Sequence, residues 1–89
     1  MPPSLAERDD VVSARSRTAF EGLRAALARD LAAARRSGDL DADADVERLA
    51  GLLLAVHRGI EALGEAGTDE AVLLGIAQAA VDGLPRRTR

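Results

Sequence analysis

Large apolar side chains recur every three or four residues through the second half of the chain. They are Val46, Leu49, Leu53, Val56, Ile60 and Leu63. This spacing keeps one side of an α-helix apolar and predicts a helix over residues 43–66. Few polar positions remain between these residues, which indicates a helix that packs against neighbours on two sides. We expect a central helix that contacts its own chain on one side and a second chain on the other.

A longer helix is predicted before this central one, over residues 4–37. An apolar stripe runs along the stretch, and no proline interrupts it. Ser4 and Glu7 have the spacing of a capping box, in which each side chain bonds a free backbone N–H of the first turn. Gly38 follows the last turn and can adopt the left-handed backbone that ends many helices.

A third helix is predicted over residues 68–84, with Thr68 as its N-cap and Pro85 just beyond its end. It is apolar or small at nearly every position, so we expect it to be buried almost all round. The basic residues Arg86, Arg87 and Arg89 follow and are expected to form a frayed end. The pattern therefore predicts an all-α fold of three helices in a single domain over residues 1–89.

The joint between the first two helices is acidic. It lacks the central glycine and the closing glutamate of a calcium-binding loop, so we interpret it as a polar connection. Asp43 is the predicted N-cap of the central helix. Leu40 is expected to pack into the core, because an apolar residue just after a terminating glycine often folds back on its helix.

Small residues recur every four positions on both of the last two helices. The rows are Gly51, Ala55 and Gly59 on one helix and Ala71, Gly75, Ala79 and Gly83 on the other. Such rows let another helix approach closely. Alanine and glycine are abundant in this chain, so chance is the alternative, but two rows in register favour an interface. We therefore predict a dimer interface formed by Gly51, Leu54, Ala55, Gly59, Ala71, Gly75, Ala79 and Gly83.

Composition supports a partner and a soluble state. A chain of 89 residues buries only about 60–65% of the surface that it exposes when unfolded, so it is marginally stable alone. It has no cysteine, so neither a disulfide nor a cysteine-held metal can help, whereas a second subunit could. The net charge of −3 argues against direct DNA binding, which needs a basic face. No stretch has the length of a membrane span or the pattern of a secretion signal, so we expect a cytoplasmic protein with no membrane partner.

Residues that could carry catalysis are few. His57 is the only histidine, and no serine has the context of a nucleophile. We therefore expect no enzyme, no cofactor and no metal site. Asp30 and His57 interrupt apolar stripes, and with Phe20 they are the candidate ligand-facing residues. The alternative is that Asp30 and His57 lie at the edge of a stripe and bond a local partner.

The order of these elements resembles the C-terminal part of TetR-type transcriptional regulators. The residues that carry the resemblance are Gly38-Asp39-Leu40, the acidic joint Asp41 to Asp45, Glu47-Arg48-Leu49-Ala50 and the late Gly59. In that family the last two helices form a four-helix bundle with those of a twin subunit, and the preceding helix helps to enclose an effector pocket. The resemblance thus implies a homodimer that takes part in binding a small hydrophobic effector.

The family's N-terminal helix-turn-helix has no counterpart in this sequence. We therefore expect the dimerisation and partial effector-binding domain of a truncated regulator, or a small protein that forms a heterodimer with a full-length TetR-like relative. The alternative is a stand-alone helical adaptor that binds an amphipathic helix of another protein. The effector and the target genes are not evident from the sequence.

Overall fold

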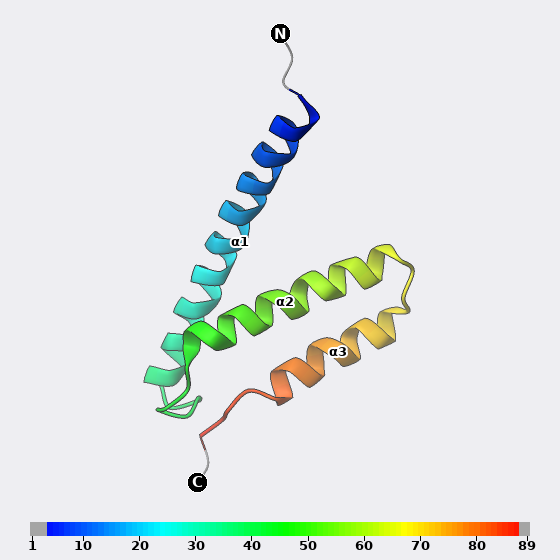
Figure 1. Cartoon of the computed structure of the whole chain (residues 1–89). Helices are drawn as coiled ribbons and strands as arrows, with labels where there is room; N and C mark the ends of the chain where they lie inside the picture. The colour runs from blue at the N-terminus through cyan, green and yellow to red at the C-terminus, as the bar shows by residue number, and fades with distance from the viewer. Residues whose placement is uncertain (1–3, 88–89) are drawn as a thin grey trace.

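The computed structural model describes residues 4–87, with the backbone alone for residues 5–9. Three helices follow one another: α1 (Leu5–Arg36), α2 (Val46–Glu65) and α3 (Glu70–Asp82) (Figure 1). No strand occurs in the described part of the chain apart from one isolated β-bridge. The predicted all-α arrangement of three helices is confirmed for these residues. None of the described helices is both long and apolar enough to cross a lipid bilayer.

Glycine ends the first two helices in the way that the sequence predicts. Gly38 and Gly67 have φ angles of 88° and 91°, in the left-handed region that favours glycine. After α1, the N–H of Asp39 donates to the carbonyl of Ala34 at 2.9 Å and that of Gly38 donates to the carbonyl of Arg35 at 3.2 Å. This pair of bonds is a Schellman motif, and an equivalent pair closes α2.

The N-cap of α2 is Asp45 and not Asp43, so the predicted cap is wrong and the helix begins three residues later than expected. The Asp45 carboxylate accepts the backbone N–H of Arg48 at 3.2 Å. Asp43 instead donates its backbone N–H to the carboxylate of Asp41 at 3.3 Å. This side-chain bond turns the chain before the helix, which leaves Asp43 too early to cap it.

Thr68 is also not the cap that the sequence predicts. Its N–H donates to the carbonyl of Leu63 at 3.0 Å and so completes the Schellman motif of α2. Asp69 takes the N-cap position of α3, although its side chain makes no capping bond. The helix then ends at Asp82, two residues before the predicted end.

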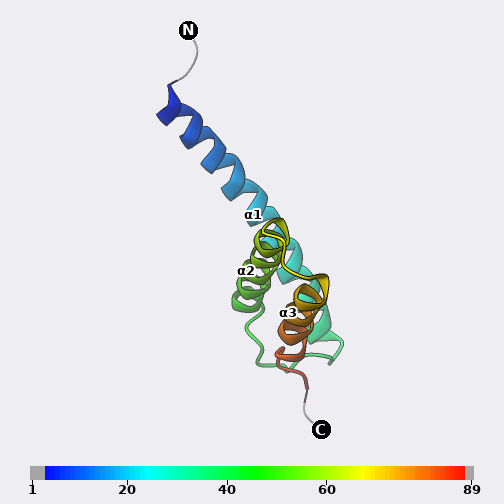
Figure 2. The same cartoon turned by 90° about the vertical axis from the view of Figure 1, so that its right-hand side faces the viewer.

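The three helices form one layer. Helix α2 packs against both α1 and α3, which do not touch each other (Figures 1 and 2). The molecule measures 63 × 31 × 13 Å, and its thinnest dimension is close to one helix diameter of about 10–12 Å. Its radius of gyration is 16.8 Å, against about 12 Å for a compact chain of this length. Within residues 4–87, no second layer covers either face of these helices.

The core lies where α1, the joint and the start of α2 meet. Its buried members are Ala28, Leu31, Leu40, Ala44 and Ala50. The predicted burial of Leu40 is therefore confirmed. Helix α3 contains no buried residue, so the expectation that it is buried almost all round is wrong for the single chain.

The C-terminal segment returns to this joint and pairs with it. Leu40 and Arg86 form an antiparallel β-bridge, and the N–H of Asp41 donates to the carbonyl of Pro85 at 2.9 Å. The N–H of Arg87 donates to the carbonyl of Asp39 at 3.4 Å. The expected frayed end is therefore wrong for residues 86 and 87, and Arg89 lies outside the described residues.

Candidate interaction surface

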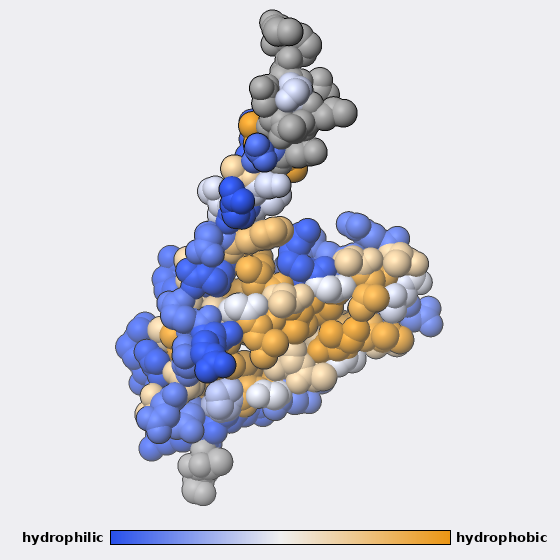
Figure 3. Space-filling view, viewed as in Figure 1, coloured by the Kyte–Doolittle hydropathy of each residue, from blue (hydrophilic) through white to orange (hydrophobic). Residues whose placement is uncertain are grey.

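Helices α2 and α3 expose a large apolar surface. Space-filling representation shows apolar side chains gathered over both helices, beside the more polar α1 (Figure 3). The exposed large side chains of this region are Leu52, Leu63, Val72, Leu74 and Val81. Leu74 is 63% exposed and Leu52 is 55% exposed. Apolar side chains at this density on two adjacent helices are typical of an interaction site.

A shallow groove runs between the two helices. Its walls are Leu53, Val56, His57 and Ile60 from α2 and Ala77, Ala80 and Val81 from α3. The groove has a volume of about 190 Å³ and is lined mainly by carbon atoms. One ring nitrogen of His57 is engaged, since its Nε2 lies 3.0 Å from Oε1 of Glu61. The groove can thus accept an apolar side chain or a small apolar ligand.

The rows of small residues are mostly exposed. Of the eight residues predicted for the interface, Gly51 and Leu54 are partly buried and the other six are exposed. A Cβ atom added at Gly51, Gly59 or Gly75 would meet no other atom within 4 Å. Packing inside this chain therefore does not require glycine at these positions, although each glycine weakens its helix by about 1 kcal/mol relative to alanine.

The groove and the row lie on opposite sides of α2. At 100° per residue, Ala55 of the row is about 160° around the helix from Leu53 of the groove. Leu54 lies four residues after Ala50, which is wholly buried, and so lies toward the packed side of the helix. Leu54 is therefore not part of the exposed surface. The α2 row forms one small-residue surface, exposed at Ala55 and Gly59, and the groove forms a second, apolar surface.

The three candidate ligand-facing residues do not line one cavity. The guanidinium of Arg58 lies over the ring of Phe20, with its Cζ atom 4.9 Å from the ring centre. Asp30 is exposed and is ten residues, or about 15 Å, further along α1. His57 alone lines the groove. A ligand in the groove would thus meet His57 without Asp30.

Charged contacts join α1 to α2. Arg24 donates to the carboxylate of Glu21 at 3.1 Å and also bonds Glu47 of α2. The bond to Glu21, followed by that to Glu47, raises the pKa of the Arg24 guanidinium above its usual value. Among the described residues no polar side chain is buried, and no group of three His, Cys, Asp or Glu is placed to hold a metal ion.

The groove between α2 and α3 was not predicted from the sequence. The signal was present, because Leu53, Val56 and Ile60 belong to the apolar stripe of α2. What the stripe could not indicate is that the residues of α3 opposite them are mostly alanine, which leaves a hollow instead of a filled contact.

Comparison with family models, with curated proteins and with solved structures finds no match to this chain.

Proposed function

We propose that this chain is the dimerisation and partial effector-binding domain of a TetR-like transcriptional regulator. In this proposal α2 and α3 pair with the same helices of a second copy and form a four-helix bundle. The proposal rests on the resemblance of the sequence and on one structural observation, the uncovered apolar surface of a single helical layer.

The exposed area supports a partner. The chain exposes 6757 Å², whereas a compact monomer of this mass exposes about 5,000 Å². The excess of about 1,800 Å² is more than twice the roughly 800 Å² that each partner contributes to a standard interface. A dimer with a standard interface would therefore cover a little under half of this excess and leave apolar surface open.

A second copy fits this surface because the surface is suited to pairing with itself. A two-fold dimer brings the same patch of each copy together, so large side chains of one copy must meet space on the other. On α2, Leu52 directly follows Gly51 and precedes Gly59 by about two turns, and on α3, Val72 precedes Gly75 by about one turn. The open space at the three glycines can receive the side chains of the second copy.

The effector role is partial. Drug-sized ligands occupy pockets of about 300–1,000 Å³, and the groove of about 190 Å³ is smaller and open. A hydrophobic effector would therefore need walls from another chain or another domain. DNA binding is proposed to come from a full-length TetR-like relative in a heterodimer, because the net charge of −3 does not favour contact with phosphates.

The groove favours one alternative. An apolar groove between two antiparallel helices can hold the apolar face of a third helix, and a stand-alone adaptor would use it to bind an amphipathic helix of another protein. The two proposals differ in solution, because the adaptor is a monomer until its partner is added.

Sedimentation equilibrium at micromolar concentration tests the proposal. We expect a mass of twice that of one chain and a melting temperature that rises with protein concentration, since association stabilises the folded state by mass action. A folded monomer with a melting temperature independent of concentration would contradict the homodimer and favour the adaptor.

A further inference from the structure

A second cavity lies at the other end of the molecule, around the joint. It has a volume of about 470 Å³. Its lining residues are Arg35, Arg36, Gly38, Leu40, Asp41, Ala42 and Arg87. Three of these residues are arginines and one is acidic, in a chain whose net charge is −3. Basic side chains thus outnumber acidic ones on the cavity wall, although the protein as a whole is acidic.

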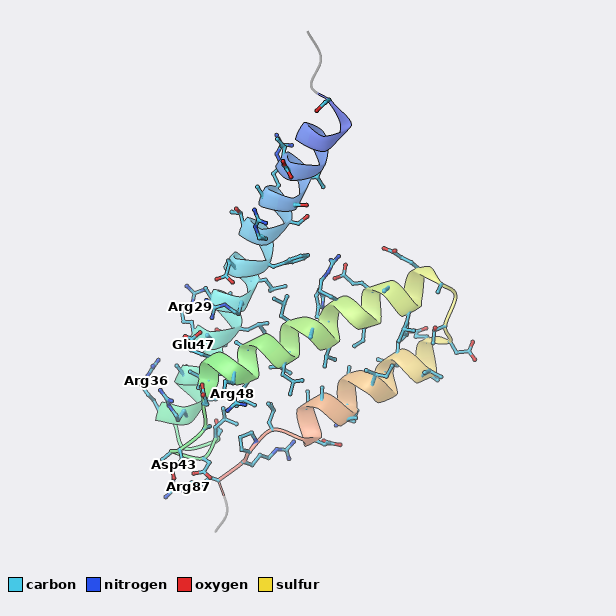
Figure 4. All side chains as sticks on the ribbon, viewed as in Figure 1. Arg29, Arg36, Asp43, Glu47, Arg48 and Arg87 are labelled. Carbon is cyan, nitrogen blue, oxygen red and sulfur yellow. The ribbon has the colours of Figure 1, made fainter. Side chains whose placement is uncertain are left out.

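Two distant segments supply the arginines (Figure 4). Arg35 and Arg36 belong to the last turn of α1, and Arg87 belongs to the C-terminal segment that pairs with the joint. Side chains alternate along extended backbone, so Arg86 and Arg87 lie on opposite sides of the segment. Arg86 reaches back to Asp82 at 3.7 Å, and Arg87 lines the cavity.

The two outer guanidinium groups have no partner in the described part of the chain. The side chains of Arg36 and Arg87 make neither a hydrogen bond nor an ion pair there, whereas Arg35 donates to the carbonyl of Ala44 at 3.0 Å. Asp41 is the only carboxylate on the cavity wall, and its Oδ1 already accepts the N–H of Asp43. The cavity therefore carries more positive charge than its own residues neutralise.

We propose that this cavity binds the phosphate group of a small organic phosphate. The planar guanidinium offers paired N–H donors that match phosphate oxygens, and arginine is the residue most often used for such recognition. The volume exceeds the needs of a bare ion and leaves room for an attached organic group beside Leu40 and Ala42. The site is at the joint, away from the small-residue rows, and its occupancy does not require a dimer.

Isothermal titration of the whole chain tests the site, with inorganic phosphate and phenyl phosphate as probes and sodium chloride used to hold ionic strength constant. We expect saturable binding of both probes at one site per chain. Arg36→Gln and Arg87→Gln should each weaken binding by about tenfold, the effect of losing one charge-assisted hydrogen bond. Both side chains are exposed and unbonded, so both variants should fold as the parent does.

Arg29→Gln is the matched control. Arg29 is also exposed and lies on the same side of α1 as Arg36, two turns or about 10 Å away. The Arg29→Gln substitution changes the net charge by the same amount but lies outside the cavity. The affinity of this variant for both phosphate probes should therefore equal that of the parent. Absence of saturable binding, or equal weakening by all three substitutions, would overturn the proposal, because the arginines would then only balance the acidic joint. Binding of inorganic phosphate without phenyl phosphate would overturn the assignment to an organic phosphate.

Discussion

The two ends of α2 have opposite environments. Near its start, Ala50 is wholly buried among residues of α1 and the joint. Every residue from 61 to 65, at its other end, is exposed. Three segments of chain converge at the first end, whereas only two helices meet at the second. Each helix at the second end therefore buries only the strip of side chains that contacts the other helix. The chain thus forms a complete core at the joint, whereas the apolar side chains at the opposite end can be buried only by another molecule.

Removing a core side chain should have the largest effect on this comparison. Leu31 is 7% exposed, and Leu31→Ala should lower the free energy of unfolding by about 2–5 kcal/mol through lost burial and a residual cavity. Leu74→Ala, on the groove side of the open end, should change it by about 0.5 kcal/mol or less. Chemical denaturation measures both. Similar losses at the two positions would break the comparison and indicate that another chain covers Leu74.

A large side chain in the small-residue row tests what covers the open end. In the single chain a Cβ atom added at Gly75 meets no atom within 4 Å, so Gly75→Leu should stabilise α3 by about 1 kcal/mol. In the proposed dimer it should instead cost about 1–3 kcal/mol in each copy, because it pushes the helices apart. Gly22→Leu is the control, since Gly22 is equally open but lies on α1. Sedimentation and thermal unfolding should show dissociation for Gly75→Leu alone, and a more stable dimer would place the interface elsewhere.

The helix caps give the smallest contrast between the two ends. Asp45→Ala removes a side-chain bond to the first turn of α2 and should cost about 1 kcal/mol. Asp69→Ala removes no such bond, so only the favourable interaction of its charge with the α3 dipole is lost, about 0.3 kcal/mol. Thermal unfolding of the two variants under identical conditions measures the difference. A larger loss for Asp69→Ala would show that the start of α3 is the more constrained.

Much of the fold could be predicted because its signals are local. The apolar period defines three helices, and Gly38 and Leu40 mark how α1 ends and folds back. The caps were harder, because four aspartates alternate along the joint and any of them could cap a helix. Which one does so depends on the bond between Asp41 and the backbone of Asp43, and the spacing of the acidic residues does not reveal it.

Of the candidate sites, the small-residue rows could be predicted from the sequence and the basic cavity could not, again because only local signals are visible there. The small-residue rows are visible in the sequence because they repeat within a helix. The basic cavity is not, since it requires Arg87 to return to the end of α1 across most of the chain. The burial of α3 was also mispredicted from its hydrophobic pattern. The pattern indicates that an apolar surface must be buried, but it does not show whether the same chain or another one buries it.

The bridge between Leu40 and Arg86 also bears on the order of folding. Most contacts in this helical chain are local, which favours fast folding. The bridge instead joins positions just over half the chain apart, so its formation carries a larger loop-closure entropy than any helical turn. It can form only after α2 and α3 have turned back on each other at Gly67. We therefore expect the C-terminal segment to be the last part to dock and the first to detach, which would make the basic cavity transient in a molecule whose helices stay intact.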